Sequence, residues 1–460
     1  MRAFIASSIG VTCAAALVLP LAAPAGAAPD TPAHPATAGS VPAEASEPAG
    51  VPGSTQSLAM DPLASPSVRA TGAPAAAAAE QGLPERDVQP FSLVGVVWDD
   101  VNTELHGTAQ VRTRATGTGQ WSDWQDLETH NAEHSADAGT AERDSGAARG
   151  STAPLWVGDS DGVEVRVRPE TPGPGEAAEA PVPLPAGLHL ELVDPGKDPQ
   201  QVPGTDPAES PATDPLEEGP GTGVAGADRA TSPGAAAVLP ALNRAETEEA
   251  AGLAPAAKPY IGPRPRIITR KGWGADEKLR ESGFAYTKTV KAAFIHHSAT
   301  GNNYKCSQAP SVLRGIYRYH VKSSGWRDIG YNFAVDKCGN IYEGRAGGVT
   351  KAVMGAHTLG FNTNTMGIAV LGTFTTSNPP AAAVNAVSKL TAWKLGLFGA
   401  NPKGKVTLTS GGSNKYKKGK KVKLNVISGH RDGFATECPG ARLYKKLGTA
   451  RTSSAKLQGR

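Results

Sequence analysis

The sequence predicts an α/β domain in its C-terminal part, preceded by a β-sandwich-like domain, with disordered segments around both. The first indication is composition, because 54 Gly, 38 Pro and 5% aromatic residues among 460 leave too little core material for one continuous globule. The second is charge. From Lys258 onward there are 34 Lys and Arg against 8 Asp and Glu, whereas residues 1–257 hold 12 against 35. This division separates an acidic N-terminal part from a basic module.

The N-terminus has the pattern of a secretory signal peptide over residues 1–28. Arg2 precedes an apolar stretch from Phe4 to Leu21, and small residues follow at Ala25–Ala28. An uncleaved anchor helix is the alternative, but the small-residue site favours cleavage near Ala27 or Ala28. Because no later apolar run approaches about 18–20 residues, we expect no membrane span in the mature chain. We expect it to be secreted, either extracellular or associated with the cell wall.

Residues 29–90 are rich in Ala, Pro, Ser, Glu and Gly and are predicted to be disordered. Residues 91–195 carry apolar runs with the period of two that is typical of half-buried strands, and predict an antiparallel β-rich domain. The runs are Val94–Trp98, Ala109–Arg114, Val163–Arg168 and Leu188–Leu192. Residues 196–257 return to Pro, Gly and acidic residues, and predict a disordered linker.

Two features of the β-rich domain allow more than one interpretation. Its tryptophans either pack in the core, which we favour, or form a platform on which a sugar stacks. They are Trp98, Trp121, Trp124 and Trp156. His130 and His134 are four residues apart, which suits metal binding on a helix, but they lie among strands and loops. We therefore expect no metal at His130 and His134.

The C-terminal domain, residues 258–450, mixes strand-like and helical patterns. Runs at Ala292–His296, Tyr331–Val335 and Gly367–Leu371 predict strands, and Ser311–Lys322 and Ala381–Leu397 have apolar residues at helical spacing. Strands that alternate with helices predict an α/β domain of about 190 residues.

Three residues of this domain have the chemistry of zinc ligands. His296 ends a buried strand, His430 stands in a Gly-His-Arg-Asp sequence, and Cys438 follows eight residues later. Imidazole and thiolate are preferred by Zn²⁺, and three protein ligands with one open position define a catalytic site. Spacing alone also allows these histidines to be structural. The sequence contains neither a Cys-x₂-Cys pair nor HExxH, so a zinc knuckle and an HExxH protease are unsupported.

The cysteine count supports a separate role for Cys438. Cys13 lies in the predicted signal peptide, which leaves Cys306, Cys338 and Cys438. An odd number in an oxidising compartment indicates one bridge and one thiol with another function. A Cys306–Cys338 bridge would close a loop in the unfolded chain and so stabilise the folded state by ~3 kcal/mol or more. A bridge from Cys438 to one of the other two is the alternative.

Five segments together resemble the peptidoglycan recognition protein family, which is similar to the phage lysozyme-type N-acetylmuramoyl-L-alanine amidases. They are Ile267–Ala275 and residues 294–300, 325–345, 355–372 and 428–440. The resemblance covers about residues 260–447, with the segments in order. It implies a zinc amidase fold, in which a mixed central sheet is flanked by helices and a cleft lies over the zinc.

The resemblance also assigns roles to individual residues. The family's zinc ligands correspond to His296, His430 and Cys438, and its active-site tyrosine corresponds to Tyr331. Thr436 stands where some phage-type members have lysine, and we expect it to help hold the reaction intermediate. Members that bind without cutting typically lack the ligand cysteine, so Cys438 favours catalysis. The family also allows the Cys306–Cys338 disulfide.

Three further residues are candidates for the substrate side of the site. His357 lies in a segment that lines the cleft in the family, and Arg345 ends another shared segment. His297 is adjacent to a ligand and is expected to orient its neighbours there rather than to bind metal. Local hydrogen bonding is the alternative role for each of them.

The function implied is that of a secreted Zn²⁺-dependent amidase, which hydrolyses the amide between N-acetylmuramic acid and L-alanine in peptidoglycan. A non-catalytic peptidoglycan-binding protein of the same fold is the alternative, and a zinc peptidase of the stem peptide is a third possibility. The cationic run Lys415–Lys423 could bind anionic wall polymers or form a solvated loop. Nucleic acid is not expected as a partner, because this run has only Tyr416 for base stacking. We expect a monomer.

Overall fold

The computed structural model describes residues 53–63, 80–129, 134–170, 182–198, 236–252 and 260–460. The predicted signal peptide lies outside these residues. All of the described residues belong to one compact unit, Glu47–Arg460. Among the helices in these ranges, none is long and apolar enough to span a membrane.

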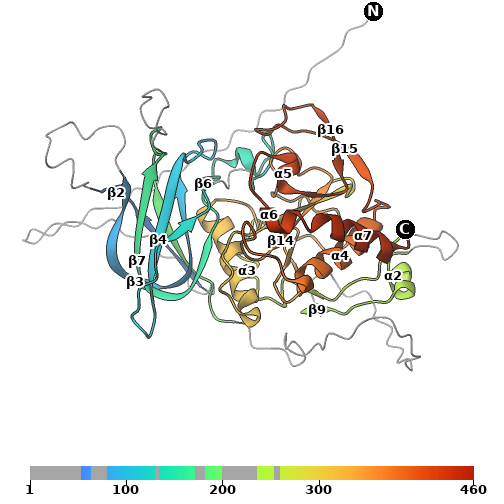
Figure 1. Cartoon of the computed structure of the whole chain (residues 1–460), viewed down its shortest axis with the longest axis horizontal. Coiled ribbons are helices and arrows are strands. Elements are labelled where there is room, and N and C mark those ends of the chain that lie inside the picture. The colour runs from blue at the N-terminus through green and yellow to red at the C-terminus, as the bar shows by residue number, and fades with distance from the viewer. Residues whose placement is uncertain (1–52, 64–79, 130–133, 171–181, 199–235, 253–259) are drawn as a thin grey trace, which may run out of the picture. The chain divides into compact units, whose positions relative to one another are not determined.

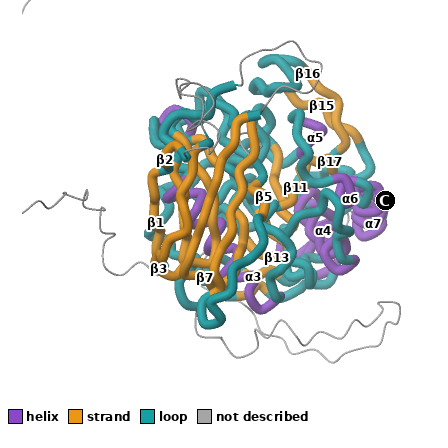
Figure 2. The backbone as a smooth tube through the Cα atoms, turned by 60° about the vertical axis from the view of Figure 1, so that its left-hand side comes forward, coloured by secondary structure: helices purple, strands orange, loops and turns teal. Residues whose placement is uncertain are grey.

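The N-terminal domain is an antiparallel β-domain with the strand order β1-β8-β3-β7-β4-β5, and β2 and β6 also pair with β3 (Figure 1). The strands are β1 (Ser54–Ala59), β2 (Asp61–Pro62), β3 (Gln81–Trp98), β4 (Gly107–Ala115), β5 (Gln125–Leu127), β6 (Gly150–Ser151), β7 (Leu155–Pro169) and β8 (His189–Asp194). Figure 2 shows these strands running side by side. The four strand-like runs of the sequence all lie within this domain.

The domain begins earlier than the sequence indicated. β1, β2 and the first half of β3 lie in residues 29–90, which we expected to be disordered. β1 pairs with β8 along its whole length, from Ser54 opposite Asp194 to Ala59 opposite His189. The partner of each β1 residue lies 130 to 140 residues away in the sequence, as Ala59 opposite His189 and Ser54 opposite Asp194 show. Local composition carries no sign of such pairing.

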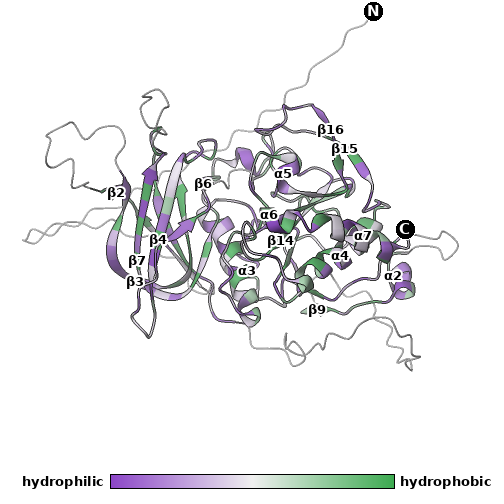
Figure 3. Ribbon diagram, viewed as in Figure 1, coloured by the Kyte–Doolittle hydropathy of each residue, from purple (hydrophilic) through white to green (hydrophobic). Residues whose placement is uncertain are grey.

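One continuous sheet forms the sandwich-like core. β3 and β7 pair along their length, with irregularities between Leu83 and Leu93. Residues from neighbouring strands, such as Leu83 of β3, Val165 of β7 and Leu190 of β8, are buried in the same core. Along β7, hydrophobic residues alternate with hydrophilic ones (Figure 3), as the period of two predicted.

The end of β3 differs from the half-buried strand that we expected. Every residue from 91 to 98 is buried. Val94 and Val96 face the core of the β-domain, whereas Leu93 and Val97 pack with helix α3 (Ala309–Arg318) of the C-terminal domain. A strand that is covered on both faces needs a continuous apolar run, and this explains the sequence of this segment.

The tryptophans of the β-domain divide into two groups. Trp98 is buried in its core and donates from Nε1 to the Thr103 carbonyl at 2.8 Å. Trp156 is buried in the cluster shared with the C-terminal domain. Core packing is therefore confirmed for these two. Trp121 and Trp124 are partly exposed, and the guanidinium of Arg112 lies over both rings.

A seven-stranded mixed sheet forms the centre of the C-terminal domain, with the order β17-β11-β14-β12-β13-β10-β9. The strands are β9 (Val238–Leu239), β10 (Ile267–Ile268), β11 (Ala292–His297), β12 (Phe333–Val335), β13 (Ile341–Glu343), β14 (Thr365–Val370) and β17 (Ile427–Gly429). β11 is parallel to both β14 and β17, whereas β12 and β13 are antiparallel. β15 (Lys405–Thr409) and β16 (Lys421–Asn425) form a separate hairpin.

Helices pack against both faces of this sheet. α3 begins with Pro310 in its first turn, continues into the π-helix η4 (Tyr319–Ser323), and buries its apolar side with the β-domain and the sheet. α4 (Ala381–Gly396) and α7 (Leu447–Gln458) contribute to the second core cluster, with Val387, Leu390 and Leu447. α5 (His430–Gly433) and α6 (Ala441–Tyr444) are single turns. The mixed sheet flanked by helices agrees with the expected α/β fold.

Two further observations bear on the predicted segments. Cys306 and Cys338 form a disulfide, which ties the short helix η3 (Cys306–Gln308) to the turn between β12 and β13. The predicted pairing is confirmed, and Cys438 forms no disulfide in the described part of the chain. The region 196–257, expected to be a disordered linker, contains β9 and helix α2 (Arg244–Ala250), which begins with a capping box at Asn243.

Candidate metal centre

Four buried side chains meet at one edge of the mixed sheet. They are His134, His296, His430 and Cys438, and one nitrogen or sulfur atom from each lies within 4.8 Å of all the others. The Cys438 Sγ is 3.8 Å from the His296 Nδ1 and 3.6 Å from the His134 Nε2. Three of the four are the residues that the sequence singled out as ligands.

Strand register explains why His296 and His430 lie together. β11 and β17 are parallel neighbours in which Ile295 lies opposite Gly429. The next residues, His296 and His430, therefore lie at the same edge of the sheet, and their imidazole ring centroids are 4.5 Å apart. His430 starts α5, and the chain then turns back through a loop to Cys438, whose carbonyl accepts from the Arg431 amide at 3.0 Å.

His134 comes from the N-terminal domain, in the connection between β5 and β6. Its ring centroid is 4.5 Å from that of His430 and 5.1 Å from that of His296. His134 thus joins a group of four buried residues that could hold a metal ion, an arrangement that the sequence did not lead us to expect. The spacing from His130 was the only signal in the sequence, and His130 itself lies outside the described residues.

Burial favours the neutral form of the His134 and His296 imidazoles. It lowers the pKa of His134 to about 3, and burial together with the neighbouring His430 and His134 rings holds the pKa of His296 well below its usual value. A neutral imidazole is the form that binds metal. The buried His134 Nδ1 has no hydrogen-bond partner among the described residues. A buried set of three imidazoles and one thiol fits Zn²⁺ in its donor types.

A second layer of side chains orients His296. The Thr358 hydroxyl lies 3.5 Å from the His296 Nε2 and 3.0 Å from the His357 Nδ1. These contacts leave the His296 Nδ1 on the side of Cys438. His357 is fully buried, and its ring packs edge-on against that of His296 with centroids 5.3 Å apart. The predicted substrate contact of His357 is therefore not found, because His357 lies behind a candidate ligand.

His297 also differs from the predicted contact. It follows His296 on β11, so its side chain leaves the opposite face of the strand. Its Nδ1 accepts from the Phe374 amide at 3.3 Å, and burial lowers its pKa to about 4. The His297 backbone carbonyl lies 3.9 Å from the Cys438 Sγ. His297 is thus buried and supports the loop around the cluster.

Tyr331 and Thr436 lie beside the cluster. The Tyr331 ring, just before β12, is 5.5 Å from that of His296 and 5.8 Å from that of His134, centroid to centroid. Thr436 is partly exposed, and its hydroxyl accepts from the Cys438 amide at 3.1 Å. Thr436 therefore supports the backbone of Cys438, and it lines a surface hollow with Arg431 and Phe434.

Arg345 is engaged in a buried ion pair. Its guanidinium donates two hydrogen bonds of 2.8 Å to the two carboxylate oxygens of Glu142, and a third of 2.8 Å to the Ile329 carbonyl. Glu142 belongs to the N-terminal domain. Burial would raise the pKa of Glu142, but the Arg345 charge and hydrogen bonds outweigh it and lower that pKa. The residue predicted to contact substrate thus contacts a carboxylate of the same chain.

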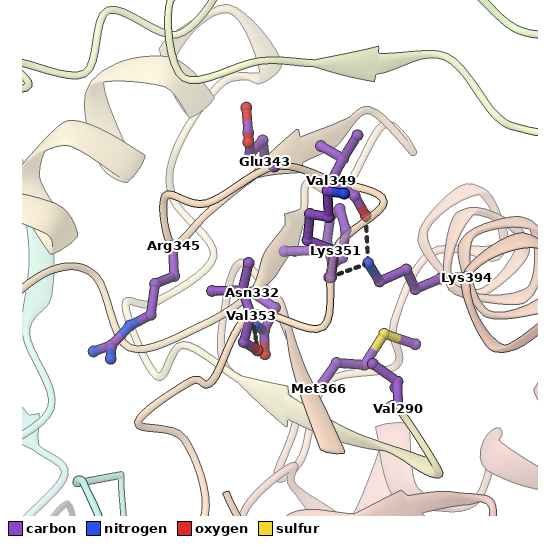
Figure 4. Close-up of a pocket in the computed structure, with 11 residues that line it drawn as sticks. Val290, Asn332, Glu343, Arg345, Val349, Lys351, Val353, Met366 and Lys394 are labelled. Atoms are coloured by element: carbon purple, nitrogen blue, oxygen red, sulfur yellow. Dashed lines mark hydrogen bonds between the residues drawn. The ribbon is translucent and has the colours of Figure 1, made fainter. Parts of the chain in front are cut away.

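A second buried cation lies farther from the cluster, in the pocket shown in Figure 4. Lys394 of α4 donates from Nζ to the carbonyls of Val349 and Lys351, and burial lowers its pKa to about 7. Arg345 also lines this pocket, but its guanidinium points away from Lys394 (Figure 4).

Comparisons with known proteins agree with this architecture. Residues 286–441 match the family model described as N-acetylmuramoyl-L-alanine amidase, and residues 42–186 match one described as Rv3811 N-terminal galactose-binding domain-like. Peptidoglycan-recognition protein SC2 of Drosophila melanogaster is 31% identical over 185 residues, which cover 40% of this chain and 85% of that protein. Peptidoglycan-recognition protein LB of the same organism is 31% identical over 183 residues, with 40% and 67% covered.

Solved structures of such proteins also match part of the chain. Drosophila PGRP-LB is 27% identical, with 40% of this chain and 93% of that chain covered and a TM-score of 0.32. Peptidoglycan recognition protein-LE in complex with tracheal cytotoxin is 32% identical, with 40% and 92% covered and a TM-score of 0.32. The sequence matches define the C-terminal domain as one of the amidase-type domains. The chain belongs to the peptidoglycan recognition protein family.

Proposed function

We propose that this protein is a secreted zinc-dependent amidase that cuts the amide bond between N-acetylmuramic acid and L-alanine in peptidoglycan. The observation that carries the proposal is the convergence of His296, His430 and Cys438 at one sheet edge, with all four clustered donor atoms within 4.8 Å. Three such donors are the ligand number of catalytic zinc sites. The cysteine is the ligand that non-cutting members of the family typically lack.

The substrate class is supported by the relatives. One of the solved neighbours is peptidoglycan recognition protein-LE in complex with tracheal cytotoxin, which is a monomeric diaminopimelic acid-type peptidoglycan. The amidase match covers residues 286–441, which include every residue of the cluster except His134. We therefore assign peptidoglycan as the substrate, and the muramoyl–alanine amide as the bond.

His296, His430 and Cys438 would hold the zinc ion. When bound, zinc supplies a water with a pKa near 7 and a positive charge next to the scissile carbonyl. Thr358 keeps the His296 Nδ1 turned toward Cys438, since its hydroxyl lies 3.5 Å from the other ring nitrogen. Thr436 holds the Cys438 amide at 3.1 Å and so fixes the thiolate. Both residues therefore act by positioning ligands.

We assign to Tyr331 the role of acting on the substrate. Its ring lies beside the cluster, with its centroid 5.5 Å from that of His296. There its hydroxyl would donate a hydrogen bond to the carbonyl oxygen as negative charge develops on that oxygen. A donor in such a position is worth about 2.7–4 kcal/mol of transition-state stabilisation.

The test is mass spectrometry of peptidoglycan fragments after digestion with the zinc-loaded full chain. We expect free amino termini on L-alanine and intact muramoyl sugars, and no such products after Cys438→Ser or chelation. New termini at a cross-link would instead indicate a peptidase. The function is contradicted when neither the full chain nor a His134→Ala variant, which keeps the three ligands, releases these products. Binding of peptidoglycan without cleavage by both proteins would support the non-catalytic alternative.

A further inference from the structure

We propose that His134 is a fourth protein ligand of the same metal, and that residues 134–145, the plug segment, keep the full chain in a latent state. This proposal rests on the proposed function, since a latent site needs a metal and a reaction to block. The plug segment includes the short helix η1 (Arg143–Ser145) and belongs to the N-terminal domain. The amidase domain alone would then keep the open position that the full chain fills.

The geometry of the cluster is the first argument. The His134 Nε2 is 3.6 Å from the Cys438 Sγ, and the His134 ring faces those of His296, His430 and Tyr331. His134 is 5% exposed, and all four side chains of the cluster are buried. Four protein ligands are typical of closed structural zinc sites, whereas catalytic sites leave the fourth position for water or substrate. The imidazole therefore competes with the water that the reaction needs.

Hydrogen bonds anchor the plug segment to one wall of the site. The Asp137 Oδ1 accepts from the Gly360 amide and from the Asn362 side chain, both at 2.7 Å. The same Asn362 amide group donates to the Ser135 carbonyl at 2.9 Å. Asp137 and Ser135 are buried. These contacts are made by residues that directly follow His134 in the sequence, and they hold the backbone there close to the cluster.

An ion pair anchors the other end. Glu142 and Arg345 form two parallel hydrogen bonds of 2.8 Å, and their side chains are 5% and 4% exposed. The Arg327 amide also donates to Glu142, at 3.3 Å. Two-pronged arginine–carboxylate pairs are among the stronger polar contacts in proteins, and breaking a buried one is costly. Arg345 cannot bind an acidic group of the stem peptide while Glu142 occupies its guanidinium.

Packing between the two domains fixes the position of the plug segment against the amidase domain. The connection between β5 and β6 leads into β6, where the Ser151 hydroxyl lies 3.1 Å from that of Ser324. The Tyr319 hydroxyl, at the end of α3, donates toward the carbonyls of Val96 and Thr152 at 3.2 and 3.1 Å. At Gly325, an added Cβ would lie 1.8 Å from the Ala147 carbonyl oxygen. The sheet edge next to the plug segment thus fits closely against the amidase domain.

The first experiment counts the metal ligands without relying on activity. Zinc-edge X-ray absorption of the full chain is expected to fit three nitrogen neighbours and one sulfur. His134→Ala should lose one nitrogen and gain an oxygen, and its Co²⁺ form should show a visible spectrum that changes with pH as a bound water ionises. His106→Ala, at an exposed histidine of the same domain, should match the wild-type chain. A wild-type spectrum with two nitrogens, one sulfur and an oxygen overturns the proposal.

The second experiment measures whether loss of the plug contacts raises the rate of peptidoglycan cleavage. His134→Ala and Glu142→Gln should each raise the rate of peptidoglycan cleavage. The double variant should cleave at least about tenfold faster than the wild-type chain, a ratio that corresponds to about 1.4 kcal/mol. Cys438→Ser should remove activity from every variant. Equal activity in the wild-type and double-variant proteins overturns latency but leaves the amidase intact. No activity in any of them contradicts the proposed function, whereas the ligand count still tests His134.

Discussion

His296 and His430 leave neighbouring parallel strands at the same edge of the sheet, with ring centroids 4.5 Å apart. The register between Ile295 and Gly429 brings them together although they are far apart in the sequence. Side chains held by two paired strands need little rearrangement to accept a metal, so each contribution to the site can be tested by substitution.

Removal of the thiolate is the most direct of these tests. We expect Cys438→Ser to lower zinc affinity and amidase activity by at least about two orders of magnitude, because one of the three ligands that the site requires is lost. Metal content by mass spectrometry and product release would be measured together. The fold should persist, since Cys438 forms no disulfide among the described residues. Full activity of this variant would exclude Cys438 as a ligand.

Tyr331→Phe should separate chemistry from metal binding. The phenyl ring retains its packing against the His296 and His134 rings, so zinc content should not change. We expect kcat to fall about 100-fold and KM to change little, since the hydroxyl acts on the charge that develops in the transition state. Tyr260→Phe, at a half-exposed tyrosine, is the matched control. A change in KM alone would indicate that Tyr331 only binds substrate.

The disulfide should matter for stability rather than for catalysis. Cys306 and Cys338 are separated by 32 residues, and a loop of this size constrains the unfolded chain by about 3–4 kcal/mol. We expect the double Cys→Ser variant to lower the free energy of unfolding by about that amount in urea titrations. Its zinc content should equal that of the wild-type chain. An unchanged unfolding midpoint would show that the bridge contributes nothing to stability.

Lys394 predicts a pH dependence of stability. Burial lowers its pKa from 10.5 to about 7 in the folded chain. Between these pH values the unfolded chain binds more protons, so the free energy of unfolding should rise with pH in this window and be insensitive to Lys394 below about 7. Urea unfolding at pH 7 and pH 9.5 measures the change. The rise should be smaller in Lys394→Met than in Lys389→Met, at an exposed lysine of the same helix. Equal slopes in the two variants would disprove this assignment.

The sequence predicted the parts of the fold that depend on local pattern. The strand that ends at His296 and the helices near 311–322 and 381–397 lie within a few residues of β11, α3 and α4. Periodicity reports which face of an element is buried, and these elements bury their faces in the ordinary way. β1 was not predicted, because its stability comes from pairing with β8, which is far away in the sequence. A local sequence pattern gives no information about such a distant partner.

The same division runs through the site. The sequence was enough to select His296, His430 and Cys438 as candidate ligands, from their residue types, their spacing and the family resemblance. Imidazole and thiolate groups can be recognised as metal-binding types from the sequence alone. His134, and the Glu142 that occupies Arg345, depend on how one domain docks on another. That docking follows from the apolar face of β3 packing on α3. Only the tertiary structure could therefore show that the N-terminal domain reaches the cluster of His296, His430 and Cys438.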